Sequence, residues 1–138
     1  MKRRMKVITV AICIAALLMT QVSAFASTAE PCYNAVSSVN SYFGIDGKVA
    51  RYGLDLFSQK TTSFDYVHID ATVRTVGGRV IKTYDENLTK SGCNYTFNKS
   101  TTLTYSGTYF MHYTLKCYKN GKVIDEITKN TSQDTYTA

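Results

Sequence analysis

Residues 109–118 read YFMHYTLKCY, and apolar and polar side chains alternate over the whole stretch. Residues 66–74 read YVHIDATVR and alternate in the same way. Because successive side chains of a β-strand point to opposite faces, each stretch predicts a strand with one face in a core and the other in solvent. The expected core face of the first stretch consists of Tyr109, Met111, Tyr113, Leu115 and Cys117. The two stretches therefore indicate an all-β protein.

Turn signals separate further strand-like segments on both sides. Gly77-Gly78 and Asn120-Gly121 are typical of tight hairpins, because these residues accept the positive φ that such turns need. Strands are expected at 32–43, 50–57, 66–74, 79–84, 93–105, 109–118 and 122–129. The first segment also has apolar residues at helical spacing, so a helix is the alternative there, although its Ser, Asn and Val content favours a strand. Residues 85–92 are expected to form a polar connection, and the chain after Lys129 a frayed tail.

The number and spacing of these strands predict a fold class. Seven short alternating strands in about 100 residues suit a seven-stranded, immunoglobulin-like antiparallel β-sandwich. Tyr109 follows Gly107-Thr108 at the start of the sixth strand, where such folds place a corner tyrosine. The chain has no Trp, and no Cys pair links the second and sixth strands, so it departs from true immunoglobulin domains.

The N-terminus has the order of a secretory signal peptide. Basic residues at positions 2, 3, 4 and 6 precede an apolar run from Val7 to Met19, and Ala24-Phe25-Ala26 then offers a cleavage site. The run of 13 residues is too short to span about 30 Å of hydrocarbon. We expect residues 1–26 to be removed, which leaves 112 of the 138 residues as a single β-sandwich domain, 27–138, with an ordered core over 31–130. The mature chain is expected to be secreted and to have no membrane span.

Removal of the signal peptide changes the charge. The full chain has 16 basic and 10 acidic residues, a net charge of +6. Four of the basic residues precede Val7, so the mature chain has 12 basic and 10 acidic residues and a net charge of +2. No run of three basic residues remains, so the electrostatic footprint of a nucleic-acid binder is missing. We expect no nucleic-acid partner.

Three short segments carry a resemblance to known proteins. They are Ala-Glu-Pro-Cys-Tyr-Asn at 29–34, Ser-Gly-Thr-Tyr at 106–109 and Lys-Asn-Gly-Lys at 119–122. Together with the signal peptide, they resemble uncharacterised small secreted proteins of Gram-positive bacteria. The resemblance covers most of the mature chain, and its motifs are common turn and strand patterns. It implies an extracellular immunoglobulin-like sandwich and assigns no functional residue.

The mature chain keeps an odd number of cysteines, Cys32, Cys93 and Cys117. Strands that run alternately up and down bring all three to one end of the sandwich, which predicts one disulfide and one spare thiol in an oxidising compartment. We expect the Cys93–Cys117 bridge, whose loop of about 24 residues would contribute roughly 3 kcal/mol. Cys32 is the alternative partner of Cys117. We expect the spare thiol to be either an inert group or a bridge to a second copy, in a disulfide-linked homodimer, or to another protein. A three-thiolate metal site is disfavoured because the spacing contains no CxxC unit.

The outward faces of the third and sixth strands supply the candidates for a binding surface: Tyr66, His68, Asp70, Phe110, His112 and Tyr118. These strands are neighbours in an immunoglobulin-type sheet, so the exposed aromatic side chains can form one contact surface. Ordinary cross-strand pairing that stabilises the sheet is the favoured explanation of these aromatic residues, and a binding surface is the second. His68, Asp70 and His112 also offer the nitrogen and oxygen ligands that zinc or copper binds, but alternation favours a solvated polar face, and nothing in the sequence fixes the register that a metal site needs. We therefore assign no metal and no cofactor.

Sequence signatures of enzymes are absent. The chain contains no GxSxG, HExxH or phosphate-binding glycine loop. Asp85-Glu86 and Asp125-Glu126 are adjacent pairs whose side chains face opposite ways on a strand. The sequence predicts a non-catalytic binding module that contacts an unknown protein or a cell-wall or surface ligand outside the cell. The alternative is a structural, self-assembling envelope protein joined through a spare cysteine, and a hydrolase or metalloenzyme using His68 and His112 ranks last.

Overall fold

A computed structural model of the 138-residue chain describes residues 35–59 and 63–138. They belong to Tyr33–Ala138, the second of the two units into which contacts divide the chain. The signal peptide expected at 1–26 and Cys32 lie outside the described residues. Over the described ranges the chain forms strands and turns and no helix, and thus no helix suited to crossing a membrane.

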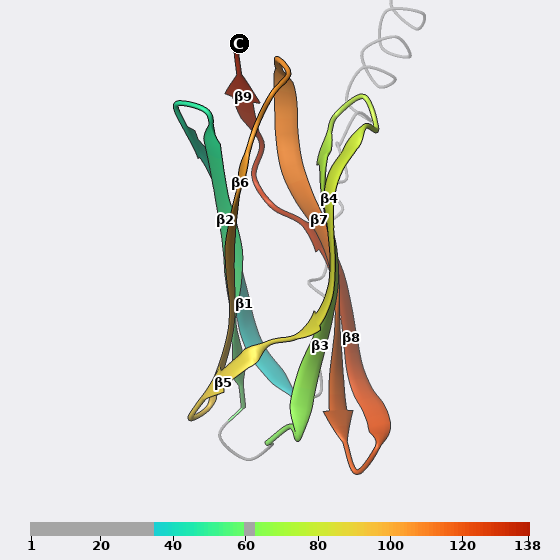
Figure 1. Cartoon of the computed structure of the whole chain (residues 1–138). Coiled ribbons are helices and arrows are strands. Elements are labelled where there is room, and N and C mark those ends of the chain that lie inside the picture. Colours follow the sequence, from blue (N-terminus) through green and yellow to red (C-terminus); the bar gives the residue numbers. More distant parts are fainter. Residues whose placement is uncertain (1–34, 60–62) are drawn as a thin grey trace, which may run out of the picture. The chain divides into compact units, whose positions relative to one another are not determined.

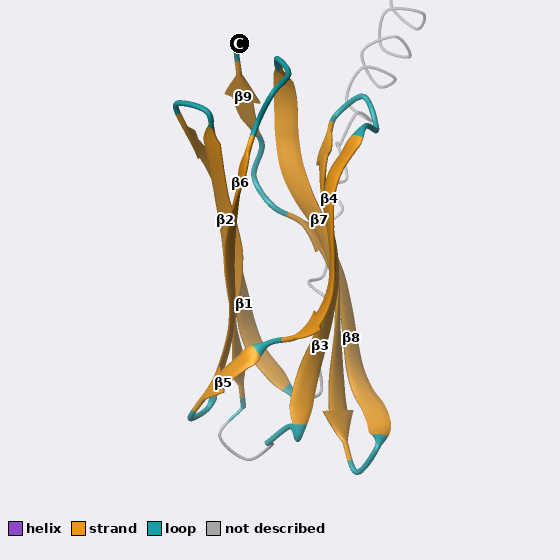
Figure 2. Cartoon of the chain, viewed as in Figure 1, coloured by secondary structure: helices purple, strands orange, loops and turns teal. Residues whose placement is uncertain are grey.

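In the described residues, nine strands form two antiparallel sheets that face each other (Figure 1). Figure 2 shows that tight turns join most of them. The first sheet has the strand order β1 (Val36–Asp46), β2 (Val49–Ser58), β6 (Asn94–Thr102) and β5 (Thr89–Ser91). The second sheet has the order β4 (Val80–Asn87), β3 (Tyr66–Thr75), β7 (Gly107–Lys119) and β8 (Lys122–Asn130), and β9 (Asp134–Tyr136) also pairs with β7. The expected all-β, two-sheet sandwich is confirmed.

The core lies between the sheets and consists of the residues that alternation selects. On β7 the expected core face, Tyr109 to Cys117 at every second position, is completely buried. Tyrosines fill much of this space, and they meet polar partners inside it. The Tyr52 hydroxyl of β2 lies 2.6 Å from the Tyr84 hydroxyl of β4, which links the two sheets. Burial, followed by the hydrogen bond to Tyr84, raises the pKa of Tyr52.

The two hairpin turns form where the glycines indicate them. Gly78 has a φ of +92°, and Asn120 and Gly121 have φ values of +51° and +72°. Such angles are accessible to glycine and, less readily, to asparagine. Residues 36–46, where a helix was the alternative, form the strand β1. The strand prediction for this segment is therefore confirmed over the residues that the structure describes.

The prediction of a polar connection over 85–92 is wrong. The strand β4 continues to Asn87, and residues 89–91 form β5. Leu88 between them is 7 % exposed and donates its N–H to the Val67 carbonyl over 2.8 Å. Glu86 points toward the first sheet and pairs with Lys99 over 2.8 Å. The buried Leu88 side chain and the Glu86–Lys99 ion pair between the sheets thus stabilise strand structure in a segment of mostly polar residues.

The prediction of a frayed tail after Lys129 is also wrong. β9 pairs with the start of β7, and Tyr136 is 7 % exposed. Thr131 is buried, and its hydroxyl accepts a 2.9 Å hydrogen bond from the Met111 N–H. The Asp134 carboxylate accepts the Ile45 N–H over 2.8 Å and thereby joins the tail to β1. The ordered domain therefore extends beyond residue 130, and the described strands number nine rather than seven.

Candidate functional site

All six predicted binding-face residues lie on the outer face of the second sheet. Tyr66, His68 and Asp70 come from β3, and the other three candidates come from β7. On both strands the intervening residues are buried in the core, so these six point away from it. The prediction that the two strands are neighbours is confirmed, because β3 and β7 pair along their whole shared length. We refer to this surface of β4, β3, β7 and β8 as the outer face.

Aromatic side chains mark both ends of the outer face. Tyr66 and Tyr118 are cross-strand partners whose rings stack with centroids 4.5 Å apart and an interplanar angle of 13°. Tyr66 is 39 % exposed. Eight residues along β7, or about 26 Å, separate Tyr118 from Phe110, over which the Arg74 guanidinium lies at 5.2 Å. Polar side chains occupy the rows between these two aromatic ends.

The register separates the two histidines. His68 lies opposite Lys116, and His112 lies opposite Thr72. Four residues of strand, or about 13 Å, therefore separate His68 from His112 along the sheet. A single metal site made of His68, Asp70 and His112, the sequence hypothesis, is thus wrong in its third member, because the register could not be derived from alternation.

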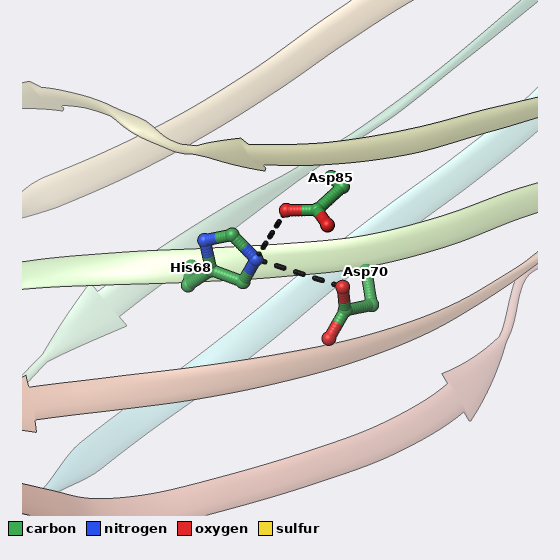
Figure 3. A group of neighbouring side chains, drawn as sticks. All are labelled: His68, Asp70 and Asp85. Atoms are coloured by element: carbon green, nitrogen blue, oxygen red, sulfur yellow. Dashed lines mark ion pairs between the residues drawn. The ribbon is translucent and has the colours of Figure 1, made fainter.

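Asp85 takes the place that the hypothesis gave to His112. It lies on β4 opposite Asp70, and Asn87 lies opposite His68. The His68 Nε2 atom is 2.9 Å from Asp85 Oδ1 and 3.5 Å from Asp70 Oδ1 (Figure 3). The other ring nitrogen, Nδ1, is 3.0 Å from Asn87 Oδ1. We call His68, Asp70, Asp85 and Asn87 the His68 quartet.

Lys116 on the neighbouring strand β7 adds a positive charge beside this quartet. The Lys116 ammonium is 3.2 Å from Asp70 Oδ2, the oxygen that faces away from the pair with His68. The hydrogen bond to Asp70 raises the pKa of Lys116. The side chain of His68 is 24 % exposed, whereas that of Asp85 is 78 % exposed. The imidazole is thus held against the sheet, while one side of the quartet is open to solvent.

The same arrangement occurs a second time on the outer face. His112 Nδ1 is 2.7 Å from Asn130 Oδ1, and these residues are cross-strand partners on β7 and β8. Two residues further along β7, Thr114 lies opposite Thr128, and their hydroxyls are 2.9 Å apart. We call His112, Thr114, Thr128 and Asn130 the His112 quartet. It differs from the His68 quartet in carrying two threonines where the first has two aspartates.

The predicted Cys93–Cys117 disulfide is absent, and both residues are free thiols. Cys93 is exposed in the turn between β5 and β6, whereas Cys117 points into the core and is completely buried. Burial, with a smaller contribution from Asp125, raises the pKa of Cys117 to about 12. The two thiols thus occupy different environments although they belong to the same end of the sandwich, as expected. Cys32, the alternative partner in the prediction, lies outside the described residues.

Comparisons with known proteins give little. No protein-family model and no curated protein matches the chain. A solved structure that matches is that of a Bacteroides fragilis protein assigned as a beta-galactosidase, with a TM-score of 0.39 and 18 % sequence identity. The match covers 67 % of this chain and 15 % of that one, so the chain spans a small part of its length. A similarity this weak identifies neither the family nor the activity.

Proposed function

We propose that the chain is a secreted, non-catalytic binding module with an immunoglobulin-like fold, active outside the cell or at the cell envelope. Its partner is a protein or a cell-wall or surface ligand, and the contact surface is the outer face. The observation that carries the proposal is the stacked pair Tyr66–Tyr118, which is partly exposed beside the charged His68 quartet.

Strand order supports the immunoglobulin-like assignment. The orders β1-β2-β6-β5 and β4-β3-β7-β8 correspond to strands A-B-E-D and C′-C-F-G of immunoglobulin-type sandwiches. The strand that corresponds to F, β7, begins with Tyr109, whose hydroxyl donates to the Tyr105 carbonyl four residues upstream. This contact has the form of a tyrosine corner. It is the contact that the position of Tyr109 in the sequence predicts.

Physical chemistry favours tyrosines as contacts on such a face. Each tyrosine offers a large, rigid surface with only two side-chain torsions, so its immobilisation costs little entropy. Stacking between Tyr66 and Tyr118 restricts the rings further before any partner arrives. The adjacent charged side chains of Asp70, Asp85 and Lys116 supply groups that can select a partner by charge. A flat face with aromatic anchors and polar neighbours is typical of protein interfaces.

The test uses the double variant Tyr66→Ala/Phe110→Ala, which removes an aromatic side chain from each end of the outer face. Labelled protein is added to cells that produce the chain, and cell-bound protein is measured by sedimentation. We expect saturable binding of the unchanged protein and a loss of more than about 10-fold in the double variant, as is typical for aromatic anchors. Its oligomeric state is expected to stay unchanged.

Tyr42→Ala is the matched control. Tyr42 is 46 % exposed on β1 of the first sheet, where its hydroxyl bonds to Asn98 over 3.0 Å. It is thus an exposed tyrosine of similar size on the opposite sheet. Binding that falls equally in Tyr42→Ala and in the double variant, or in neither, would contradict the assignment to the outer face.

One observation favours the second candidate function, a self-assembling envelope protein joined through a cysteine. Cys93 is an exposed free thiol at a turn, where a second molecule can reach it. If the protein assembles through Cys93, non-reducing electrophoresis of the secreted protein is expected to show a disulfide-linked dimer, and Cys93→Ser should abolish it. A monomer in which Cys93 reacts with iodoacetamide, while the buried Cys117 does not, excludes this assembly.

A further inference from the structure

We propose that the His68 quartet is a zinc site, in which His68 Nε2, Asp70 Oδ1 and Asp85 Oδ1 bind the ion and water completes the coordination. These three residues offer donor atoms that lie within 4.8 Å of one another. The inference goes beyond the proposed function, because the ion binds whether or not the outer face has a partner.

Distances between the donor atoms suit one ion. Zinc forms bonds of about 2.0–2.1 Å to imidazole nitrogen and carboxylate oxygen, so two ligands in tetrahedral geometry lie about 3.3 Å apart. The distances from His68 Nε2 to Asp85 Oδ1 and Asp70 Oδ1 are 2.9 and 3.5 Å. These values lie on either side of the ideal separation. The third separation, between a carboxylate oxygen of Asp70 and one of Asp85, is at most 4.8 Å, and side-chain rotation has to close it for the three atoms to surround one ion.

The hydrogen bond at the other ring nitrogen orients the imidazole for this role. Asn87 Oδ1 accepts from His68 Nδ1 over 3.0 Å, which leaves Nε2, the nitrogen that faces the two carboxylates, as the ligand atom. Histidines that bind metals almost always donate their second ring N–H to an oxygen in this way. Carboxylates accept only, so Nε2 meets Asp85 either with a proton or with a cation between them. The quartet is thus built to hold a positive charge at one point.

Lys116 acts on the same point from the neighbouring strand. It holds Asp70 through Oδ2 at 3.2 Å and leaves Oδ1 toward His68. The three ligands with neutral imidazole have a charge of −2, and the neighbouring Lys116 ammonium reduces the net charge of the group to −1 before a divalent ion binds. With this smaller negative charge, the site favours an ion that binds strongly to an imidazole nitrogen over an ion whose binding depends on several carboxylates. Zinc meets this condition, whereas magnesium and calcium prefer oxygen ligands alone.

Zinc binding by the purified protein, with exposed Cys93 alkylated to exclude its thiol as a ligand, is measured by titration calorimetry and thermal unfolding. We expect one zinc ion per chain and a rise in Tm of about 5 °C or more at ten times the dissociation constant. Magnesium at the same concentration should leave the Tm unchanged. His68→Ala is expected to abolish both the heat of zinc binding and the zinc-induced rise in Tm. Asn87→Ala, which removes only the orienting group, should weaken binding about 10-fold.

His112→Ala is the matched control, because His112 also pairs with an asparagine on the outer face but has threonines beside it. It should leave the affinity and the stoichiometry unchanged. The proposal is overturned if the unchanged protein binds no zinc at millimolar concentration, or if His112→Ala lowers the affinity as much as His68→Ala. Because the titration uses no partner, its failure leaves the result of the cell-binding experiment unaffected.

Discussion

The two quartets of the outer face have the same framework and different chemistry. In each, a histidine pairs with an asparagine across a hairpin, at 3.0 Å for His68 and 2.7 Å for His112. In each, the residue two positions after the histidine pairs with the residue two positions before the asparagine. This second pair is Asp70 with Asp85 in the first quartet and Thr114 with Thr128 in the other.

The backbone sets the positions of the four residues in each quartet, and the side chains set whether a cation can bind there. Antiparallel pairing alone brings the four positions together, because directly opposed residues of a sheet have Cβ atoms about 5 Å apart. The histidine–asparagine pair is common to both quartets, so it does not by itself create a cation site. In the His112 quartet the two hydroxyls satisfy each other. In the His68 quartet the two carboxylates cannot, and they turn to His68 and Lys116 instead.

The largest effect is expected when the first quartet is converted into the second. The variant Asp70→Thr/Asp85→Thr keeps both histidines and both asparagines and replaces the carboxylates with hydroxyls. Zinc affinity should fall by more than about 100-fold, because two of the three protein ligands are lost. Titration calorimetry measures the loss. Zinc binding that persists in this variant would show that the ion does not require the carboxylates.

The reciprocal change should move the site. Adding Thr114→Asp and Thr128→Asp to that variant places two carboxylates beside His112. Thr114 lies opposite Asp70, so the swap is made in the Asp70→Thr background to avoid two carboxylates that face each other across the strands. Zinc binding at one ion per chain should return and should now depend on His112, which His112→Ala in this background checks. Failure to regain zinc would indicate that Lys116 or the strand geometry is needed as well.

The register explains how much of the two quartets the sequence could predict. Counting outward from a two-residue turn at Gly77-Gly78 places Asp70 opposite Asp85 and His68 opposite Asn87, as in the structure. The count succeeds because an extra residue in the turn and the bulge after Val73 compensate. The sequence nevertheless does not reveal the quartet, since residues 85–87 are poor strand formers and the predicted strand ends before them.

For the other hairpin the same count fails. A two-residue turn at Asn120-Gly121 would place His112 opposite Lys129, but the irregularity between Cys117 and Tyr118 shifts the partner to Asn130. A bulge of this kind has no clear sequence signal, yet it gives every following residue a different partner. Alternation therefore predicts which face each residue of β3 and β7 occupies. It cannot predict the register between β3 and β7, and this register sets the distance of about 13 Å between the two histidines along the sheet.

The turn glycines allow the two hairpins to be perturbed separately. Gly78→Ala places a side chain at a φ of +92° in the β3–β4 hairpin, and Gly121→Ala does so at +72° in the β7–β8 hairpin. Each should lower the free energy of unfolding by about 1–2 kcal/mol in urea denaturation. Only Gly78→Ala should also weaken zinc binding, because it strains the hairpin that carries the His68 quartet. Gly77→Ala is the control, since the added Cβ meets only Thr75 Oγ1 at 3.8 Å and φ is not positive.

The smallest effect is expected for Asp85→Asn without metal. The His68–Asp85 pair is short at 2.9 Å, but the Asp85 side chain is 78 % exposed, so water screens the interaction. The free energy of unfolding should change by less than about 1 kcal/mol, while zinc binding is lost because a charged ligand becomes a neutral amide. Denaturation and zinc titration of the same variant measure both quantities. A large loss of stability with zinc binding retained would mean that the carboxylate is structural, and the two quartets would then differ in packing rather than in function.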